Sequence, residues 1–66
     1  MPIEERLALY LKKNKIRQKV VSERTGIKQA RLSMILNGQL RLRASDFEKI
    51  CAATGTDPNE IMITKT

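Results

Sequence analysis

The stretch RQKVVSERTGIKQARLSMILNG, residues 17–38, decides the fold of this chain. It predicts one helix that begins near Arg17 or Gln18 and stops at Gly26, and a second helix over about residues 28–36. Glycine adopts the left-handed backbone conformation that ends a helix at little cost, whereas most other residues do so only with strain. The stretch therefore predicts two short helices joined by a tight turn at Gly26.

Helical spacing assigns an inner side to each of these two helices. The side chains expected to be buried are Val21 and Ser22 on the first helix, Ile27 in the turn, and Leu32 with Ile35 or Leu36 on the second. Two helices that cross steeply around such a turn form a helix-turn-helix, here at about residues 17–37. The second helix of this motif can project into the major groove of DNA.

One helix is predicted before this pair and another after it. The earlier helix covers about residues 3–14, and its buried side is expected to hold Ile3, Leu7, Tyr10 and Leu11. Residues 39–43 are expected to form an exposed basic loop. The later helix is expected to bury Phe47, Ile50 and Cys51 and to end before Gly55. Its start stays open, because the residues SDFE at 45–48 resemble a capping box but the helix can also begin at Ala44.

The clearest local signal of a helix start is TDPNE, residues 56–60. Asp57 fits the N-cap, Pro58 the first helical position and Glu60 the reciprocal capping site. A short fifth helix is predicted to follow, up to about Ile63. The chain is therefore expected to be a single all-α domain, residues 1–66, folded as a compact five-helix bundle.

Positive charge is concentrated in the same part of the sequence as the helix-turn-helix. Ten of the 13 Lys and Arg residues lie between Lys12 and Arg43, a window that contains one acid, Glu23, and carries a net charge of +9. The remaining residues carry −3, and the whole chain carries +6. A field polarised in this way attracts a polyanion, because each neutralised phosphate releases condensed counterions. The coincidence of charge and motif favours a nucleic-acid-binding function.

Composition disfavours several other classes of protein. The chain has no His and a single Cys, so we expect no metal site, no internal disulfide and a reducing compartment. No apolar run approaches the roughly 20 residues that cross a bilayer, and Arg6 and two acids interrupt the N-terminal segment where a signal peptide needs its apolar core. We expect a soluble cytoplasmic protein that does not contact membranes.

An enzyme is also disfavoured. The sequence shows no His, no phosphate-cradling glycine loop and no pair of carboxylates that would flank a cleft, and 66 residues leave little volume for a pocket. We therefore expect no catalytic residue, no cofactor and no evident small-molecule ligand.

The helix-turn-helix stretch, with its continuation through the later helix to the short final one, resembles the lambdoid Cro/C1-repressor-type proteins, the XRE family of helix-turn-helix proteins. The positions that carry the resemblance are Gln18, Gly26, Asn37-Gly38 and Gly55, and the match covers nearly the whole chain. The resemblance implies a lambda-repressor-like fold and binding to double-stranded DNA, in the bacterial cytoplasm at the nucleoid.

The resemblance also implies roles for individual residues. The residues expected to read bases from the second helix of the motif are Gln29, Ala30, Arg31, Ser33 and Met34. Gln29 suits adenine, Ala30 and Met34 suit thymine methyl groups, and Arg31 suits either a guanine or a phosphate. The residues expected to contact phosphates are Arg17, Gln18, Lys28, Asn37, Arg41 and Arg43.

Three features of this sequence depart from the family pattern. Ser22 stands where alanine is common, so its hydroxyl needs a hydrogen-bond partner. Lys28 stands where a small polar cap is common, and a lysine side chain cannot cap. Leu11 and Leu36 stand where many members have an ion pair, and an apolar pair is a reasonable replacement there.

A homodimer on a palindromic operator is expected, because one short helix reads few base pairs and two half-sites multiply specificity. Its expected interface is Ile61, Met62 and Ile63, which are more apolar than a monomer needs. The leading functional hypothesis is a sequence-specific transcriptional regulator, a repressor of the phage or mobile-element type.

Two alternatives stay open. An antitoxin or a restriction-system controller would use the same fold, and a neighbouring toxin or nuclease gene would identify it. A protein-interaction module that does not bind DNA is disfavoured by the concentrated charge and by Gln18.

Overall fold

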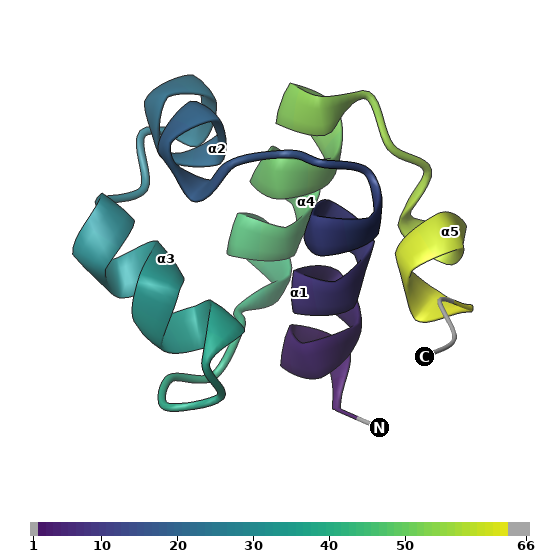
Figure 1. Cartoon of the computed structure of the whole chain (residues 1–66), viewed down its shortest axis with the longest axis horizontal. Helices are drawn as coiled ribbons and strands as arrows, with labels where there is room; N and C mark the ends of the chain where they lie inside the picture. Colours follow the sequence, from purple (N-terminus) through teal and green to yellow (C-terminus); the bar gives the residue numbers. More distant parts are fainter. Residues whose placement is uncertain (1, 64–66) are drawn as a thin grey trace.

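The computed structural model describes residues 2–63, which form helices, turns and loops without a strand. The helices are α1 (Ile3–Lys13), α2 (Gln18–Thr25), α3 (Gln29–Leu36), α4 (Ala44–Thr54) and α5 (Pro58–Met62). In Figure 1, α2 and α3 lie on one side of the molecule and α5 on the other, with α1 and α4 between them. The predicted all-α fold and the predicted helix order are confirmed.

The core is built from the inner sides of all five helices. α1 packs against α3 and α5, whereas α2 packs against α3 and α4. The buried apolar residues are Leu7, Leu11, Val21, Ile27, Leu32, Ile35, Leu42, Ile50, Cys51 and Ile61. Ile3, Tyr10, Leu36 and Phe47 are partly buried and pack against them. Each fully buried aliphatic side chain stabilises the fold by about 1.5–3 kcal/mol relative to exposure, so these contacts fix where α3 lies.

Two glycines and one aspartate define helix ends as the sequence predicts. Gly26 ends α2 and Gly55 ends α4 with φ angles of +79° and +67°, in the left-handed region that favours glycine. Asp57 is the N-cap of α5, and its Oδ1 accepts a hydrogen bond from the Asn59 N–H at 2.9 Å. These ends fix the chain direction on entry to α3 and α5.

The start of α4 follows the second of its two predicted alternatives. The helix begins at Ala44, and its N-cap residue, Arg43, makes no side-chain capping bond. The capping box at residues 45–48 is therefore not formed. Asp46 points inward instead and is only 6% exposed. In α3, Lys28 is likewise an N-cap residue without a side-chain bond, and the helix proper begins at Gln29.

Three apolar residues lie deeper than the sequence pattern indicates. The prediction that residues 39–43 form an exposed basic loop is wrong for Leu42, which is 8% exposed, and for Leu40, which is partly buried. Ile61, expected at a dimer interface, is fully buried in the core of its own chain. A helix of five residues has one inner side, and Ile61 occupies it, so Ile61 is not available to a second copy.

Candidate nucleic-acid interface

α3 has one buried side and one exposed side, as its sequence predicts. Leu32 and Ile35 are fully buried, whereas Gln29 and Ala30 at the start of the helix are exposed. Met34 is 43% exposed, so this large apolar side chain lies on the surface and not in the core. The outer side of α3 therefore presents an amide, a methyl group and a thioether to solvent, the groups that hydrogen-bond adenine and pack on thymine methyls.

Hydrogen bonds across the turn fix the angle between α2 and α3. The Ser22 hydroxyl donates to the Ile27 carbonyl at 2.5 Å, which supplies the partner that this hydroxyl needs. Thr25 Oγ1 donates to the Val21 carbonyl at 2.7 Å and accepts from the Ile27 N–H at 3.2 Å. These side chains close the turn around Gly26, so α3 is held at a set angle to α2.

The far end of α3 is held by the loop that follows it. The backbone N–H groups of Gln39 and Leu40 both donate to the Met34 carbonyl, at 2.9 and 3.2 Å. Asn37 Nδ2 reaches Ser33 Oγ at 3.5 Å, which brings together one residue expected to read bases and one expected to contact phosphate. Ser33 is partly buried, whereas Asn37 is exposed.

Exposed cations lie at both ends of α3. Lys28 immediately precedes the helix, Arg17 immediately precedes α2, and Arg41 and Arg43 lie in the loop after α3. All four side chains are exposed, and none forms an ion pair within the part of the chain that the structure describes. Their charge is thus available to an anionic partner. Gln18 is the first residue of α2 and is partly buried.

Arg31 differs from Arg17, Arg41 and Arg43, because it forms an ion pair inside the protein. Its Nη2 lies 2.8 Å from Asp46 Oδ2, an oxygen that solvent does not reach. The Arg31 guanidinium holds the pKa of the Asp46 carboxyl below its ordinary value, against the opposite effect of burial. Asp46 is therefore ionised at neutral pH, and the pair joins α3 to α4.

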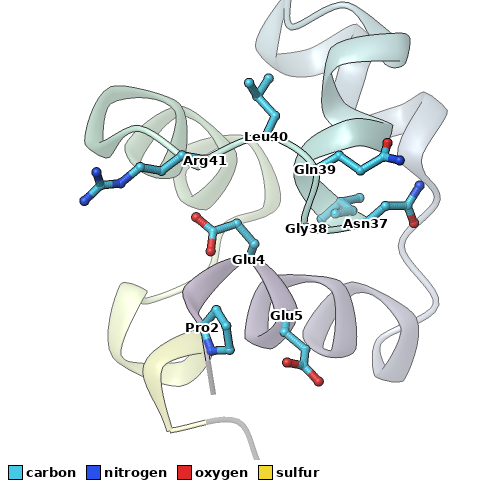
Figure 2. Close-up of a pocket in the computed structure, with 9 residues that line it drawn as sticks. Pro2, Glu4, Glu5, Asn37, Gly38, Gln39, Leu40 and Arg41 are labelled. Carbon is cyan, nitrogen blue, oxygen red and sulfur yellow. The ribbon is translucent and has the colours of Figure 1, made fainter.

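Glu4 anchors the loop that carries Arg41 and Arg43. Its Oε2 accepts a hydrogen bond from the Leu42 N–H at 2.8 Å, and this bond is the main reason that the pKa of Glu4 lies below its ordinary value. Figure 2 shows Glu4 reaching from α1 towards the loop that carries Arg41. The contact fixes the backbone between the two arginines, neither of which forms an ion pair among the described residues.

A shallow hollow of about 420 Å³ lies between α1 and this loop. Its lining includes Glu4 and Glu5 from α1 and residues 36–41 from the end of α3 and the loop, most of which are labelled in Figure 2. It is open to solvent and places two carboxylates close to the basic loop. Glu4, which lines this hollow, also bonds the loop to α1.

Sequence reasoning missed both acids, Glu4 and Asp46. Glu4 lies in the first turn of α1, where an acid is expected because it interacts favourably with the helix dipole. Nothing in the neighbouring sequence indicates that it bonds a residue 38 positions away. Asp46 stands in a segment that resembles a capping box, which favours an exposed carboxylate. The one available signal was the charge pattern, since Asp46 is the first acid after the cluster of basic residues.

The residues that the structure describes offer little to other chemistries. Within residues 2–63, no group of His, Cys, Asp or Glu side chains is arranged to hold a metal ion. Cys51 is buried, and burial raises the pKa of its thiol, which keeps the thiol protonated and unreactive. None of the helices in this range has the length and apolar character needed to cross a membrane.

The comparison with known protein families agrees with this geometry. Residues 6–66 match the family model of the Cro/C1-type HTH DNA-binding domain. No curated protein and no solved structure matches the chain. The match covers most of the sequence, so the chain belongs to the Cro/C1-type helix-turn-helix family of DNA-binding domains. Within this family, α2 and α3 are the two helices of the motif, and double-stranded DNA is the class of ligand.

Proposed function

We propose that this protein is a sequence-specific transcriptional regulator that reads the major groove of DNA with α3. It acts as a repressor of the phage or mobile-element type in the bacterial cytoplasm, on the DNA of the nucleoid. The observation that carries the proposal is the division of α3 into a buried side and an exposed side. Leu32 and Ile35 hold the helix on the core, and the exposed side is left with Gln29, Ala30 and Met34.

Each exposed group has a suitable partner on a base edge. The amide of Gln29 can accept and donate at the same time, so it fits the N6 and N7 edge of adenine. The Ala30 methyl group and the Met34 side chain fit thymine methyl groups, which project into the major groove. Ser33 lies beside Met34 in the sequence and can bond several base edges. Specificity is therefore assigned to the outer side of α3.

Phosphate contacts are assigned to the residues that flank α3. Arg17, Lys28, Arg41 and Arg43 are exposed cations that form no ion pair among the described residues, which supports contacts with the DNA backbone. Gln18 at the N-terminus of α2 and Asn37 at the end of α3 add polar donors, which fix register without reading sequence. This group supplies the salt-dependent part of the affinity.

A homodimer on a palindromic operator is the proposed binding form. Met62 and Ile63 are 52% and 71% exposed, which is unusual for large apolar residues. Beside them lies an apolar hollow of about 370 Å³, lined in part by Ile3, Phe47 and Met62. Exposed apolar surface that continues into a hollow favours contact with a second copy. With Ile61 in the core, the proposed interface consists of Met62, Ile63 and the rim of this hollow.

Selection of preferred duplexes from a random pool tests the proposal. The full chain is expected to enrich a palindrome whose half-sites lie about 34 Å apart. Its affinity for the enriched duplex is expected to fall steeply with salt, while a shuffled duplex binds far more weakly. A pool that shows no enrichment, or an affinity that does not depend on salt, would contradict the proposal. Enrichment of a single half-site would support sequence-specific DNA binding and contradict the proposed dimer.

A further inference from the structure

Arg31 and Asp46 connect two helices whose backbones do not touch. No Cα atom of α3 lies within 8 Å of a Cα atom of α4. The Arg31 side chain spans this gap and places Nη2 2.8 Å from Asp46 Oδ2. Each residue is the third of its helix, so the contact ties the start of α3 to the start of α4.

The two partners differ in their access to solvent. The Asp46 side chain is 8% exposed, whereas the Arg31 side chain is 34% exposed. A buried carboxylate is costly unless a positive charge meets it. Arg43 and Lys49 also act on Asp46 electrostatically, but only Arg31 forms an ion pair with it among the described residues. Moving Arg31 to a DNA phosphate or base would therefore leave the Asp46 charge buried without its closest partner.

Arg31 is placed differently from the residues expected to read bases. Gln29 and Ala30 are exposed at the start of α3, and Met34 is exposed one turn later. Arg31 is partly buried and turned towards α4. The other restraints on α3 come from packing against α1, from α2 through the turn, and from the loop at its far end. The ion pair adds a restraint from α4, at the end of the helix that carries Gln29 and Ala30.

We propose that Arg31 is a positioning residue: held by Asp46, it fixes the angle at which α3 presents Gln29, Ala30 and Met34, and it contacts neither bases nor phosphates. This inference rests on the proposed DNA-reading function of α3. It assigns part of the operator specificity to Asp46, an acid that lies outside the helix-turn-helix.

The proposal separates Arg31 from a phosphate-contacting or base-reading arginine. A phosphate contact contributes about one ion to the salt dependence of binding, so its loss lowers the slope by about one. A base-reading arginine discriminates at one position of the operator, and Asp46 would have no share in that discrimination. A positioning pair predicts that losing either partner changes the same positions and leaves the slope unchanged.

The test compares Arg31→Ala and Asp46→Asn with the unaltered chain. Each variant is measured by selection from a random duplex pool and by titration over a range of salt concentrations. We expect both variants to lose selectivity for the enriched duplex by a similar factor, on the order of tenfold, with the double variant no worse than either single one. Glu48→Gln is the control for Asp46→Asn, because it removes an exposed carboxylate of α4 with the same change in net charge. Arg43→Ala is the control for a phosphate contact.

A lower salt slope in Arg31→Ala, or a loss of selectivity in Arg31→Ala that Asp46→Asn does not share, would overturn the inference. If the unaltered chain selects no duplex, the proposed function fails, and the ion pair is then tested in the free protein. There, carbon NMR of the Asp46 carboxyl is expected to show its pKa rising in Arg31→Gln. An unchanged titration would overturn the ion pair itself.

If the neutral variants do not fold, variants that keep both charges test the proposal. Arg31→Lys and Asp46→Glu change the reach of the pair but not its charge. Each is expected to reduce selectivity at the same operator positions while the salt slope stays normal. If both bind with unaltered selectivity, the length of the pair does not position α3 and the inference is overturned.

Discussion

The helix-turn-helix of α2 and α3 and the junction between α4 and α5 use their polar side chains in opposite ways. At the junction, a chain of hydrogen bonds runs from partly buried hydroxyl groups to an exposed carboxylate. Thr54 Oγ1 lies 2.7 Å from Thr56 Oγ1, which donates to the Tyr10 hydroxyl at 3.2 Å, and Tyr10 donates to Glu60 at 3.1 Å. Asp57 caps α5 through the Asn59 N–H.

In the helix-turn-helix, most polar side chains point outward. Neither α2 nor α3 has a side-chain cap at its N-terminus, and the residues before them, Arg17 and Lys28, are exposed cations. Gln29 is exposed at the start of α3. The junction thus uses its polar side chains for stability, whereas the motif leaves several of its polar side chains available for a ligand.

The largest expected effect is the loss of stability when a side chain on the buried side of α3 is truncated. Leu32→Ala removes a fully buried side chain and should destabilise the fold by about 2–5 kcal/mol, because it loses transfer free energy and leaves a cavity. A domain of this size has little stability to spare. Urea unfolding followed by circular dichroism measures the loss. Met34→Ala, on the exposed side of the same helix, is the control and should stay within about 0.5 kcal/mol. Equal losses would contradict the two-sided description of α3.

The second prediction distinguishes base contacts by α3 from phosphate contacts by the loop after it. Gln29→Ala should lose about 1–3 kcal/mol of discrimination at one base step, since it removes a bidentate contact. Arg43→Ala should weaken binding to all sequences alike and lower the salt slope by about one. Binding profiles over a randomised-site library measure both effects. Identical profiles for the two variants would show that base reading and phosphate contact are not divided between α3 and the loop.

The third prediction addresses the junction. Asp57→Ala removes the N-cap of α5 and should cost about 1 kcal/mol of stability. Asp57→Asn keeps an acceptor oxygen and should recover most of that loss. Thermal unfolding measures the stabilities, and binding to the selected duplex should be unchanged at a temperature where both variants are folded. A change in base preference in Asp57→Ala would break the separation between the two regions.

The smallest effect concerns acid pH. The pKa values of Glu4 and Asp46 are lowered from ordinary values of 4.5 and 3.8, through the Leu42 N–H and Arg31 respectively. A carboxyl whose pKa is lower in the folded state binds fewer protons there, so its stabilising contribution is complete above the ordinary value. The contribution is lost as the pH falls from about 4.5 through the lower folded values. Urea unfolding between pH 7 and pH 3 should show this decline.

Glu4→Gln is the matched variant for the pH prediction, because it keeps the shape of the side chain and does not titrate. Its stability should fall less steeply below pH 4.5 than that of the unaltered chain. Glu48→Gln, which removes an exposed acid, should leave the decline unchanged. If stability falls equally with pH in all three proteins, the claim that Glu4 anchors the basic loop is contradicted.

The sequence predicts the features that depend on neighbouring residues. The helix ends at Gly26 and Gly55 follow from the backbone freedom of glycine, and the Asp57 cap follows from the adjacent Pro58. The two sides of α3 follow from helical spacing, which correctly places Leu32 inside and Met34 outside. Each of these features is fixed within one or two turns of chain.

Features that join distant segments could not be predicted in this way. Leu42 packs in the apolar core while its N–H bonds Glu4, and its loop has no periodicity from which burial can be predicted. The Arg31–Asp46 pair depends on how α3 and α4 approach each other. Ile61 is predicted at a dimer interface because three consecutive apolar residues, 61–63, do not show from the sequence which of them faces the core. The residues expected to contact DNA therefore remain predictions, although their exposure is now defined.

The most direct test of the central claim is chemical-shift mapping of the labelled protein with a duplex that contains one half-site of the selected operator. A half-site binds one copy, so contacts between copies do not contribute. The account predicts the largest shift changes at the exposed residues of α3, at Gln18 and in residues 37–43, with small changes at the α4–α5 junction. Changes centred on α5 or on the end of α4, with the exposed side of α3 unaffected, would contradict it.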